Sequence, residues 1–193
     1  MIKAVVLDIG ETLIDESRLW SRWADRLGVP TLTMLGLIGA MAALDRPHRE
    51  ALALVRPGID VEAEVESWRQ EDPHGLRDGF DEGDLYPDVR PAIAGLRDHG
   101  VDTLVAGNQP RRARPVIEGM NLGVRAVMVS EEMGVEKPSR AFFEAVVAAA
   151  AVGPAEVLYV GDRLDNDILP ARAAGLRTAL LKRGPWGFVH SQR

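Results

Sequence analysis

The sequence predicts an α/β fold in which a doubly wound parallel sheet carries an inserted α-helical domain. Two features of the chain support this prediction. From residue 86 onward, short apolar runs alternate with helical segments, an order typical of parallel β-α-β units. Between residues 15 and 85 the pattern is mostly helical and is divided by prolines. We therefore assign residues 1–14 and 86–193 to the sheet-bearing core and residues 15–85 to the helical domain.

Each predicted element follows from a local pattern. Residues 2–7 form a β-branched apolar run that ends at Asp8, which indicates a buried strand. In the helical region, Trp20, Trp23 and Leu27 share one face at the spacing of an amphipathic helix. The remaining strands are predicted at residues 101–106, 124–129, 157–160 and 177–181. The helices of the core are predicted at residues 89–98, 111–120, 139–151 and 167–174.

The composition restricts the classes of protein that fit the chain. With 193 residues, a net charge of −6 and a pI of about 5.3, the protein is not expected to bind nucleic acid, because such binding needs clustered Lys and Arg. The absence of cysteine excludes disulfides and thiolate metal sites. The longest apolar run, residues 34–44, is far shorter than the roughly 20 residues of a membrane helix, and the N-terminus lacks a secretory pattern. We expect a cytoplasmic protein with no membrane partner.

Several residues with chemically active side chains directly follow predicted strands. Asp8 ends the first strand, and Asp162 follows the fourth. Gly107 and Asn108 follow the second strand. Ligands of open parallel sheets bind beyond the carboxyl ends of the strands, so we expect these positions to converge at one edge. Lys137 lies in a loop within reach of that edge, and the combination of acids, lysine and a Gly-Asn turn indicates a site for phosphate and a metal ion.

Four short motifs occur in a fixed order along the chain. Residues 8–13 read DIGETL, residues 107–108 read GN, residues 136–138 read EKP, and residues 161–167 read GDRLDND. In this order they resemble the motifs of the haloacid dehalogenase superfamily, of which the first is D-x-D-G-T-L, the second a Ser or Thr followed by Asn, and the fourth G-D-x-x-x-N-D. The resemblance extends from Asp8 to the last strand. It implies a Rossmann-like core, and it implies that residues 15–85 are the helical, C1-type cap that this superfamily inserts after the first strand.

The resemblance also implies a role for each charged motif residue. Asp8 is expected to be the catalytic nucleophile, which attacks phosphorus and forms an aspartyl-phosphate. Lys137 is expected to bridge Asp8 and the phosphate of the substrate, a role that suits a compact ammonium. The expected Mg²⁺ ligands are Asp8, the backbone carbonyl of Gly10, Asp162 directly, and Asp167 through water.

Two motif positions depart from the superfamily's pattern, and both carry glycine. Gly10 stands where the phosphatases of this superfamily carry a second Asp, a general acid and base of a kind that typically contributes about 10²- to 10⁴-fold. Glu11 is one residue further on, and we do not assign it this role. Gly107 stands where a Ser or Thr hydroxyl holds the phosphoryl group. The backbone N–H groups of Gly107 and Asn108 are the remaining candidates for substrate binding, with a simple turn as the alternative.

These features favour a Mg²⁺-dependent phosphatase that acts through an aspartyl-phosphate on a small phosphorylated metabolite, at a rate reduced by Gly10. Because two positions are altered, one alternative is a catalytically degenerate protein that binds a phosphorylated ligand or a protein partner. Another is a haloacid dehalogenase-type hydrolysis of a C–X bond by the same aspartate, which needs no Mg²⁺; the retained Asp162 and Asp167 argue against it. Neither the substrate nor the oligomeric state can be predicted from the sequence.

The other candidate residues have simpler interpretations. Arg111, Arg112 and Arg114 are interpreted as a solvated helix face, with guidance of an anionic substrate as the alternative. Trp186 and Phe188 follow the last strand and are expected to pack on the core, with folding over the site as the alternative. The four histidines are scattered, without the spacing of metal ligands.

Overall fold

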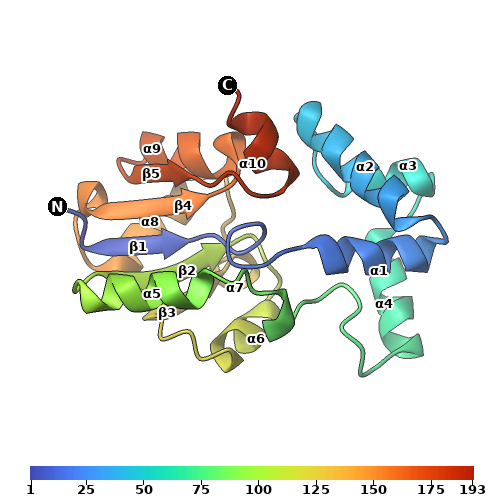
Figure 1. Ribbon diagram of the computed structural model, residues 1–193, viewed down its shortest axis with the longest axis horizontal. Helices are drawn as coiled ribbons and strands as arrows, with labels where there is room; N and C mark the ends of the chain where they lie inside the picture. Colours follow the sequence, from blue (N-terminus) through green and yellow to red (C-terminus); the bar gives the residue numbers. More distant parts are fainter. The chain divides into compact units, whose positions relative to one another are not determined.

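The computed structural model describes residues 1–193 and divides into two compact units. One unit consists of Met1–Asp15 and Asp81–Arg193, and the other is Glu16–Phe80. The larger unit contains a five-stranded sheet, whereas helices are the only regular elements of the smaller unit (Figure 1).

All five strands of the larger unit are parallel. They are β1 (Ala4–Leu7), β2 (Asp102–Gly107), β3 (Ala126–Val129), β4 (Val157–Gly161) and β5 (Arg177–Leu180), in the spatial order β3-β2-β1-β4-β5. The strand order reverses direction at β1, as in a doubly wound sheet, so the carboxyl end of β1 is the expected place for a ligand. Every strand predicted from the sequence is present, with small shifts at the ends.

Helices cover both faces of this sheet (Figure 1). They are α5 (Val89–Asp98), α6 (Ala113–Gly119), α7 (Ser130–Met133), α8 (Arg140–Ala150), α9 (Leu169–Ala173) and α10 (Gly184–His190). The helices predicted at 111–120, 139–151 and 167–174 are shorter in the structure, and α7 and α10 are absent from the sequence-based prediction. The helix predicted from residue 167 begins only at Leu169, because Leu164–Ile168 form a wider π-helical turn. Such turns are frequent at functional sites.

The core on one face of the sheet is built around aromatic side chains. Phe142 and Phe143 of α8 form a fully buried cluster with Tyr159 of β4. Neighbouring rings meet edge to face with centroids 5.3 Å apart, an arrangement that adds to the hydrophobic stabilisation. This packing fixes α8 on the sheet and thereby holds the preceding loop, which carries Lys137.

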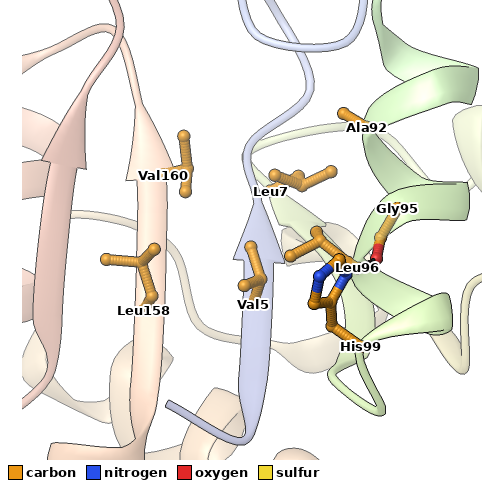
Figure 2. A pocket seen from close by; sticks show the side chains of 8 residues that line it. All are labelled: Val5, Leu7, Ala92, Gly95, Leu96, His99, Leu158 and Val160. Carbon is orange, nitrogen blue, oxygen red and sulfur yellow. Dashed lines mark hydrogen bonds between the residues drawn. The ribbon is translucent and has the colours of Figure 1, made fainter. Parts of the chain in front are cut away.

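An apolar groove lies on the opposite face of the sheet, between α5 and strands β1 and β4. Its volume is about 440 Å³. Figure 2 shows the lining residues, which are Val5, Leu7, Leu158 and Val160 of the strands and Ala92, Gly95, Leu96 and His99 of α5. No acid or lysine lines the groove, and His99 is its single titratable side chain, so it lacks the carboxylate ligands of a magnesium site. The phosphate site has to be sought at the strand ends.

The smaller unit contains four helices, α1 (Ser17–Leu27), α2 (Thr31–Ala43), α3 (Glu50–Val55) and α4 (Val61–Glu71). Helix α1 buries Trp20 and Trp23, as its amphipathic pattern predicts. Trp23 meets Trp68 of α4 edge to face, with centroids 5.4 Å apart. Arg26 of α1 pairs with Glu64 of α4 at 2.6 Å. These contacts hold α4 against α1.

No single helix of the chain is long and apolar enough to cross a membrane. Helices α1 and α2 reach the length and composition of a membrane span only as a pair, and they are bent by 117° relative to each other.

Candidate active site

Four charged side chains from three loops meet beyond the carboxyl ends of the central strands. Asp8 directly follows β1, and Asp162 directly follows β4. Lys137 lies in the loop between α7 and α8, and Asp167 lies in the π-helical turn Leu164–Ile168. None of the four is more than 7% exposed. The structure therefore brings together the four charged residues that the sequence places at this edge.

Lys137 is the positive charge at the centre of this group. Its ammonium donates a hydrogen bond to Oδ1 of Asp167 at 2.7 Å and lies 2.7 Å from Oδ1 of Asp8. The ammonium is also 5.8 Å from the centroid of the Tyr159 ring, within cation–π range. Burial lowers the pKa of Lys137, but the charges of Asp167 and Asp8 outweigh this effect and raise the pKa well above its ordinary value. Lys137 therefore stays protonated and joins the two carboxylates.

The acidity of Asp8 is changed by its surroundings. Burial raises its pKa from 3.8 to about 6; Lys137 opposes this change and Asp167 adds to it. Together with Asp162, the group contains three buried carboxylates and one buried ammonium. An excess of buried negative charge favours the binding of a cation or a proton.

The side chain of Asn108 is used to hold Lys137. Its Nδ2 donates to the backbone carbonyl of Lys137 at 2.9 Å, and its Oδ1 accepts from the backbone N–H of Lys137 at 2.8 Å. Both ends of the amide are therefore engaged by one neighbouring peptide segment. A substrate contact from Asn108 would have to come from its backbone N–H, and the side chain positions the lysine.

Gly107 is a close neighbour of Asp8. A Cβ atom at this position would lie 2.6 Å from Oδ1 of Asp8 and 3.1 Å from Cδ1 of Ile9. The same oxygen of Asp8 is held by Lys137, so it cannot move away freely. The space that a Ser or Thr side chain would need is thus occupied by the Asp8 carboxylate, which gives a physical reason for glycine at this position.

The loop after Asp8 directs Glu11 to a partner of its own. Glu11 has a positive φ of 50° and accepts a hydrogen bond from the hydroxyl of Tyr86 at 2.6 Å. Burial raises the pKa of Tyr86, and the hydrogen bond to Glu11 adds to this change, so Tyr86 remains a proton donor. With its carboxylate held in this way, Glu11 is a poor substitute for the acid that is missing at Gly10.

The three carboxylates have the chemistry of a magnesium site. Asp8, Asp162 and Asp167 each offer an oxygen, and these oxygens lie within 4.8 Å of one another. Mg²⁺ prefers hard oxygen ligands and uses few carboxylates, with water and substrate oxygens as its other ligands. A divalent cation would also offset the excess negative charge. The residues present fit Mg²⁺, and we call residues 162–167 the metal loop.

Sequence reasoning missed two residues that support the site. Tyr159 lies under the ammonium of Lys137 and donates to the carbonyl of Ala106 at 2.8 Å. Strand alternation places Tyr159 on the α8 face, and this signal was available in the sequence. His190 is 2% exposed and accepts the N–H of Leu164 in the metal loop at 3.0 Å. No sequence pattern links these last two residues.

The expectation that Trp186 and Phe188 both pack on the core is wrong for Phe188. Trp186 is 5% exposed, whereas Phe188 is 57% exposed on the other side of the short helix α10. The difference follows from helical geometry, because residues two apart in a helix do not share a face. Arg114 is exposed and pairs with Glu118 and Glu132, as a solvated helix face predicts.

Comparison with known proteins gives the family of the chain. A family model described as haloacid dehalogenase-like hydrolase matches residues 2–175, a range that contains all four motifs. The chain belongs to the haloacid dehalogenase-like hydrolases. The membership predicted from the four motifs is thereby confirmed, and so is the α/β fold with its parallel sheet.

Relatives within the haloacid dehalogenase-like hydrolases include phosphatases. The chain is 30% identical to the glyceraldehyde 3-phosphate phosphatase of Methanopyrus kandleri, over 96% of the chain and 86% of that protein. It is 34% identical to phosphoglycolate phosphatase 1 of Pseudomonas aeruginosa over 56% of the chain, which spans only 40% of that protein. A haloacid dehalogenase-like hydrolase from Bacteroides fragilis shares the fold, with a TM-score of 0.67 and 21% identity over 95% of this chain and 89% of that one.

Proposed function

We propose that this haloacid dehalogenase-like hydrolase is a Mg²⁺-dependent phosphatase that acts on a small phosphorylated metabolite through an aspartyl-phosphate on Asp8. The observation that carries the proposal is the buried group in which Lys137 lies 2.7 Å from both Asp8 and Asp167. Two relatives are phosphatases of small phosphate esters, glyceraldehyde 3-phosphate and phosphoglycolate, and this supports the substrate class.

In the proposed reaction, the carboxylate of Asp8 attacks phosphorus in line, and the bond between phosphorus and the leaving-group oxygen breaks. Lys137 holds the attacking oxygen and screens its repulsion from the phosphate. The backbone N–H groups of Gly107 and Asn108 bind the phosphoryl oxygens. Mg²⁺ supplies charge neutralisation; its proposed ligands are Asp8, the carbonyl of Gly10, Asp162 and Asp167. Water then hydrolyses the aspartyl-phosphate and releases the Asp8 carboxylate.

Proton supply to the leaving group is the weak step of this proposal. Gly10 has no side chain to donate a proton, and the Glu11 carboxylate is engaged by Tyr86. The leaving group therefore has to take its proton from water. We expect fast turnover for substrates with good leaving groups, such as acyl or aryl phosphates, and slow turnover for alkyl phosphates.

We further assign the helical unit Glu16–Phe80 to the cap of the enzyme. A cap excludes bulk water during phosphoryl transfer and carries contacts that select the substrate. This assignment rests on the position of the unit in the chain, directly after β1 and its catalytic loop.

The test is a panel of phosphate esters that includes glyceraldehyde 3-phosphate, phosphoglycolate and an aryl phosphate, assayed with Mg²⁺ and with a chelator. We compare the wild type with Asp8→Asn and with the control Asp98→Asn, whose carboxylate is 73% exposed on α5. We expect Mg²⁺-dependent turnover in the wild type and the control, and none in Asp8→Asn.

The glycines at positions 10 and 107 favour one other function, a binding protein without turnover. Mg²⁺-dependent thermal stabilisation without hydrolysis of any ester would support this function against ours. Turnover of a haloacid in the presence of a chelator would instead favour C–X hydrolysis.

A further inference from the structure

We propose that the C-terminal helix α10 positions the metal loop, and that His190 is a positioning residue for Mg²⁺ binding. The inference rests on the proposed function, since it concerns the cation site of that function. Helix α10 follows β5 (Figure 1). His190 of this helix contacts the metal loop, and Arg183, directly before the helix, contacts the loop after Asp8.

The first contact is a hydrogen bond from the metal loop to a buried imidazole. The backbone N–H of Leu164 donates to Nδ1 of His190 at 3.0 Å, and His190 is 2% exposed. Leu164 is the first residue of the π-helical turn, where a backbone N–H has no partner within the turn. Because Nδ1 accepts this bond, the proton of the neutral ring is on Nε2. His190 therefore supplies the partner that fixes the start of the turn.

A second contact reaches the residue before Leu164. The guanidinium of Arg163 lies 4.9 Å from the centroid of the Trp186 ring, and Trp186 is 5% exposed. The same guanidinium donates to both oxygens of Asp165, at 3.1 and 2.5 Å. Helix α10 thus contacts or orders three consecutive residues of the metal loop.

Arg163 is in turn hydrogen-bonded to Asp167, a carboxylate of the proposed cation site. The backbone N–H of Arg163 donates to Oδ2 of Asp167 at 3.0 Å, and the N–H of Asp167 donates to the carbonyl of Arg163 at 3.0 Å. The other oxygen of Asp167 accepts from Lys137 at 2.7 Å. A displacement of Arg163 would therefore turn the Asp167 carboxylate and disturb its bond to Lys137.

The segment that leads into α10 is attached to the rest of the site. The N–H of Leu181 donates to the carbonyl of Gly161 at 2.8 Å, directly before the metal loop. The Arg183 guanidinium donates to the carbonyl of Thr12 at 2.8 Å, in the loop after Asp8. Gly184, with a φ of +57°, lies so close to Glu11 that a Cβ atom would be 2.5 Å from its Cγ. Helix α10 is thus anchored at its start and reaches the metal loop with its later residues.

The distribution of side chains on α10 separates positioning from general apolar packing. Its buried side chains, Trp186 and His190, are the two that contact the metal loop. Its other aromatic residue, Phe188, is 57% exposed and lies 5.1 Å from the Lys182 ammonium. Phe188 therefore provides a matched control on the same helix.

The experiment measures the Mg²⁺ dissociation constant by titration calorimetry, together with the melting temperature of the metal-free, full-length protein. The variants are His190→Leu, which removes the acceptor, His190→Asn, which keeps an acceptor near the position of Nδ1, and Phe188→Ala. We expect Mg²⁺ binding about tenfold weaker in His190→Leu, the size of effect seen when residues behind metal ligands are lost. The other two variants are expected to bind within about twofold of the wild type. In assays, the KM for Mg²⁺ should rise in His190→Leu by a larger factor than kcat at saturating Mg²⁺ falls.

Several outcomes would overturn the inference. One is a His190→Leu protein that melts at a lower temperature but binds Mg²⁺ as the wild type does. Another is an equal loss of affinity in His190→Asn and His190→Leu, which would show that ring packing matters and the hydrogen bond does not. Should His190→Leu fail to fold, Trp186→Leu tests the second contact, with severalfold weaker Mg²⁺ binding expected and wild-type binding as the contrary result. A wild type that binds no Mg²⁺ contradicts the proposed function itself, so the two failures are distinguishable.

Discussion

The two sides of the proposed active site differ in how far they follow the pattern of the superfamily. On the cation side, the carboxylates of Asp8 and of the metal loop surround Lys137 in a buried, charged group. On the phosphoryl side, the two positions at which the superfamily has polar side chains are Gly10 and Gly107. The groups that bind charge are retained, whereas those that donate a proton or a hydroxyl are replaced by backbone. We therefore expect that substitutions can change ligand binding and turnover separately in the proposed site.

Restoring an acid at position 10 is expected to have the largest effect. Gly10 does not have a positive φ, so its φ is not in the left-handed region that disfavours an Asp. In Gly10→Asp, kcat for an alkyl phosphate should rise by about 10²- to 10⁴-fold, because a proton donor for the leaving group is regained. The gain for an aryl phosphate should be much smaller. Steady-state kinetics on both esters, with Gly10→Asn as the control, check this; equal rates in the Asp and Asn variants would contradict it.

Removing the positive charge of Lys137 should have the next largest effect. In Lys137→Met, kcat/KM is expected to fall by about 10²- to 10³-fold, because the ammonium that stabilises the negative charge of the transferring phosphoryl group is lost. Mg²⁺ binding should be kept, since the carboxylates remain and a neighbouring positive charge is gone. Kinetics and calorimetry on Lys137→Met and on the control Lys182→Met, outside the buried group, measure both effects. A similar loss of kcat/KM in Lys182→Met would contradict a specific role of Lys137.

A methyl group at position 107 should have an intermediate effect. In Gly107→Ala the new Cβ would lie 2.6 Å from Oδ1 of Asp8, so the nucleophile has to shift. A displacement of this kind costs about 10²-fold in kcat. The control is Gly119→Ala, where a Cβ atom meets nothing within 4 Å. Wild-type kcat in Gly107→Ala would show that the nucleophile tolerates the shift.

The smallest expected effect is on the pH dependence of stability. Asp8 has a folded-state pKa of about 6, raised from 3.8, so the folded metal-free protein holds this proton more tightly than the unfolded chain. The stabilisation is fully present below pH about 4 and is lost as the pH rises to about 6, at roughly 1.4 kcal/mol per unit of pKa shift. Asp8→Asn cannot titrate and should gain stability relative to the wild type across this range. Urea unfolding of both proteins in a chelator measures it, and parallel stability curves would contradict the assignment.

The convergence of the site was predictable because strand direction determines it. Once Asp8 and Asp162 are placed after parallel strands, the sheet brings them to one edge whatever the side-chain details. The same holds for Lys137, which lies at that edge in the loop between α7 and α8. The departures at the two glycines were also visible as missing side chains.

The pairing of side chains within the site was not predictable. The sequence suggested a substrate role only for the backbone N–H of Asn108, and it gave no sign that the side-chain amide binds the backbone of Lys137, a contact between residues 29 apart. The bond between His190 and Leu164 spans 26 residues. Helix α10 contains Pro185 and Gly187, which have low helix propensity. The sequence pattern therefore does not predict this helix, which depends on tertiary contacts. Such contacts depend on tertiary packing, so no periodic pattern in the sequence predicts them.

Three carboxylates gathered about a single ammonium also impose an order of events on the enzyme. A phosphate dianion that approaches the metal-free edge meets net repulsion, so in the proposed reaction we expect the cation to enter before the ester and to leave after the inorganic phosphate. Binding of inorganic phosphate to the protein should accordingly be lost at magnesium concentrations too low to fill the site.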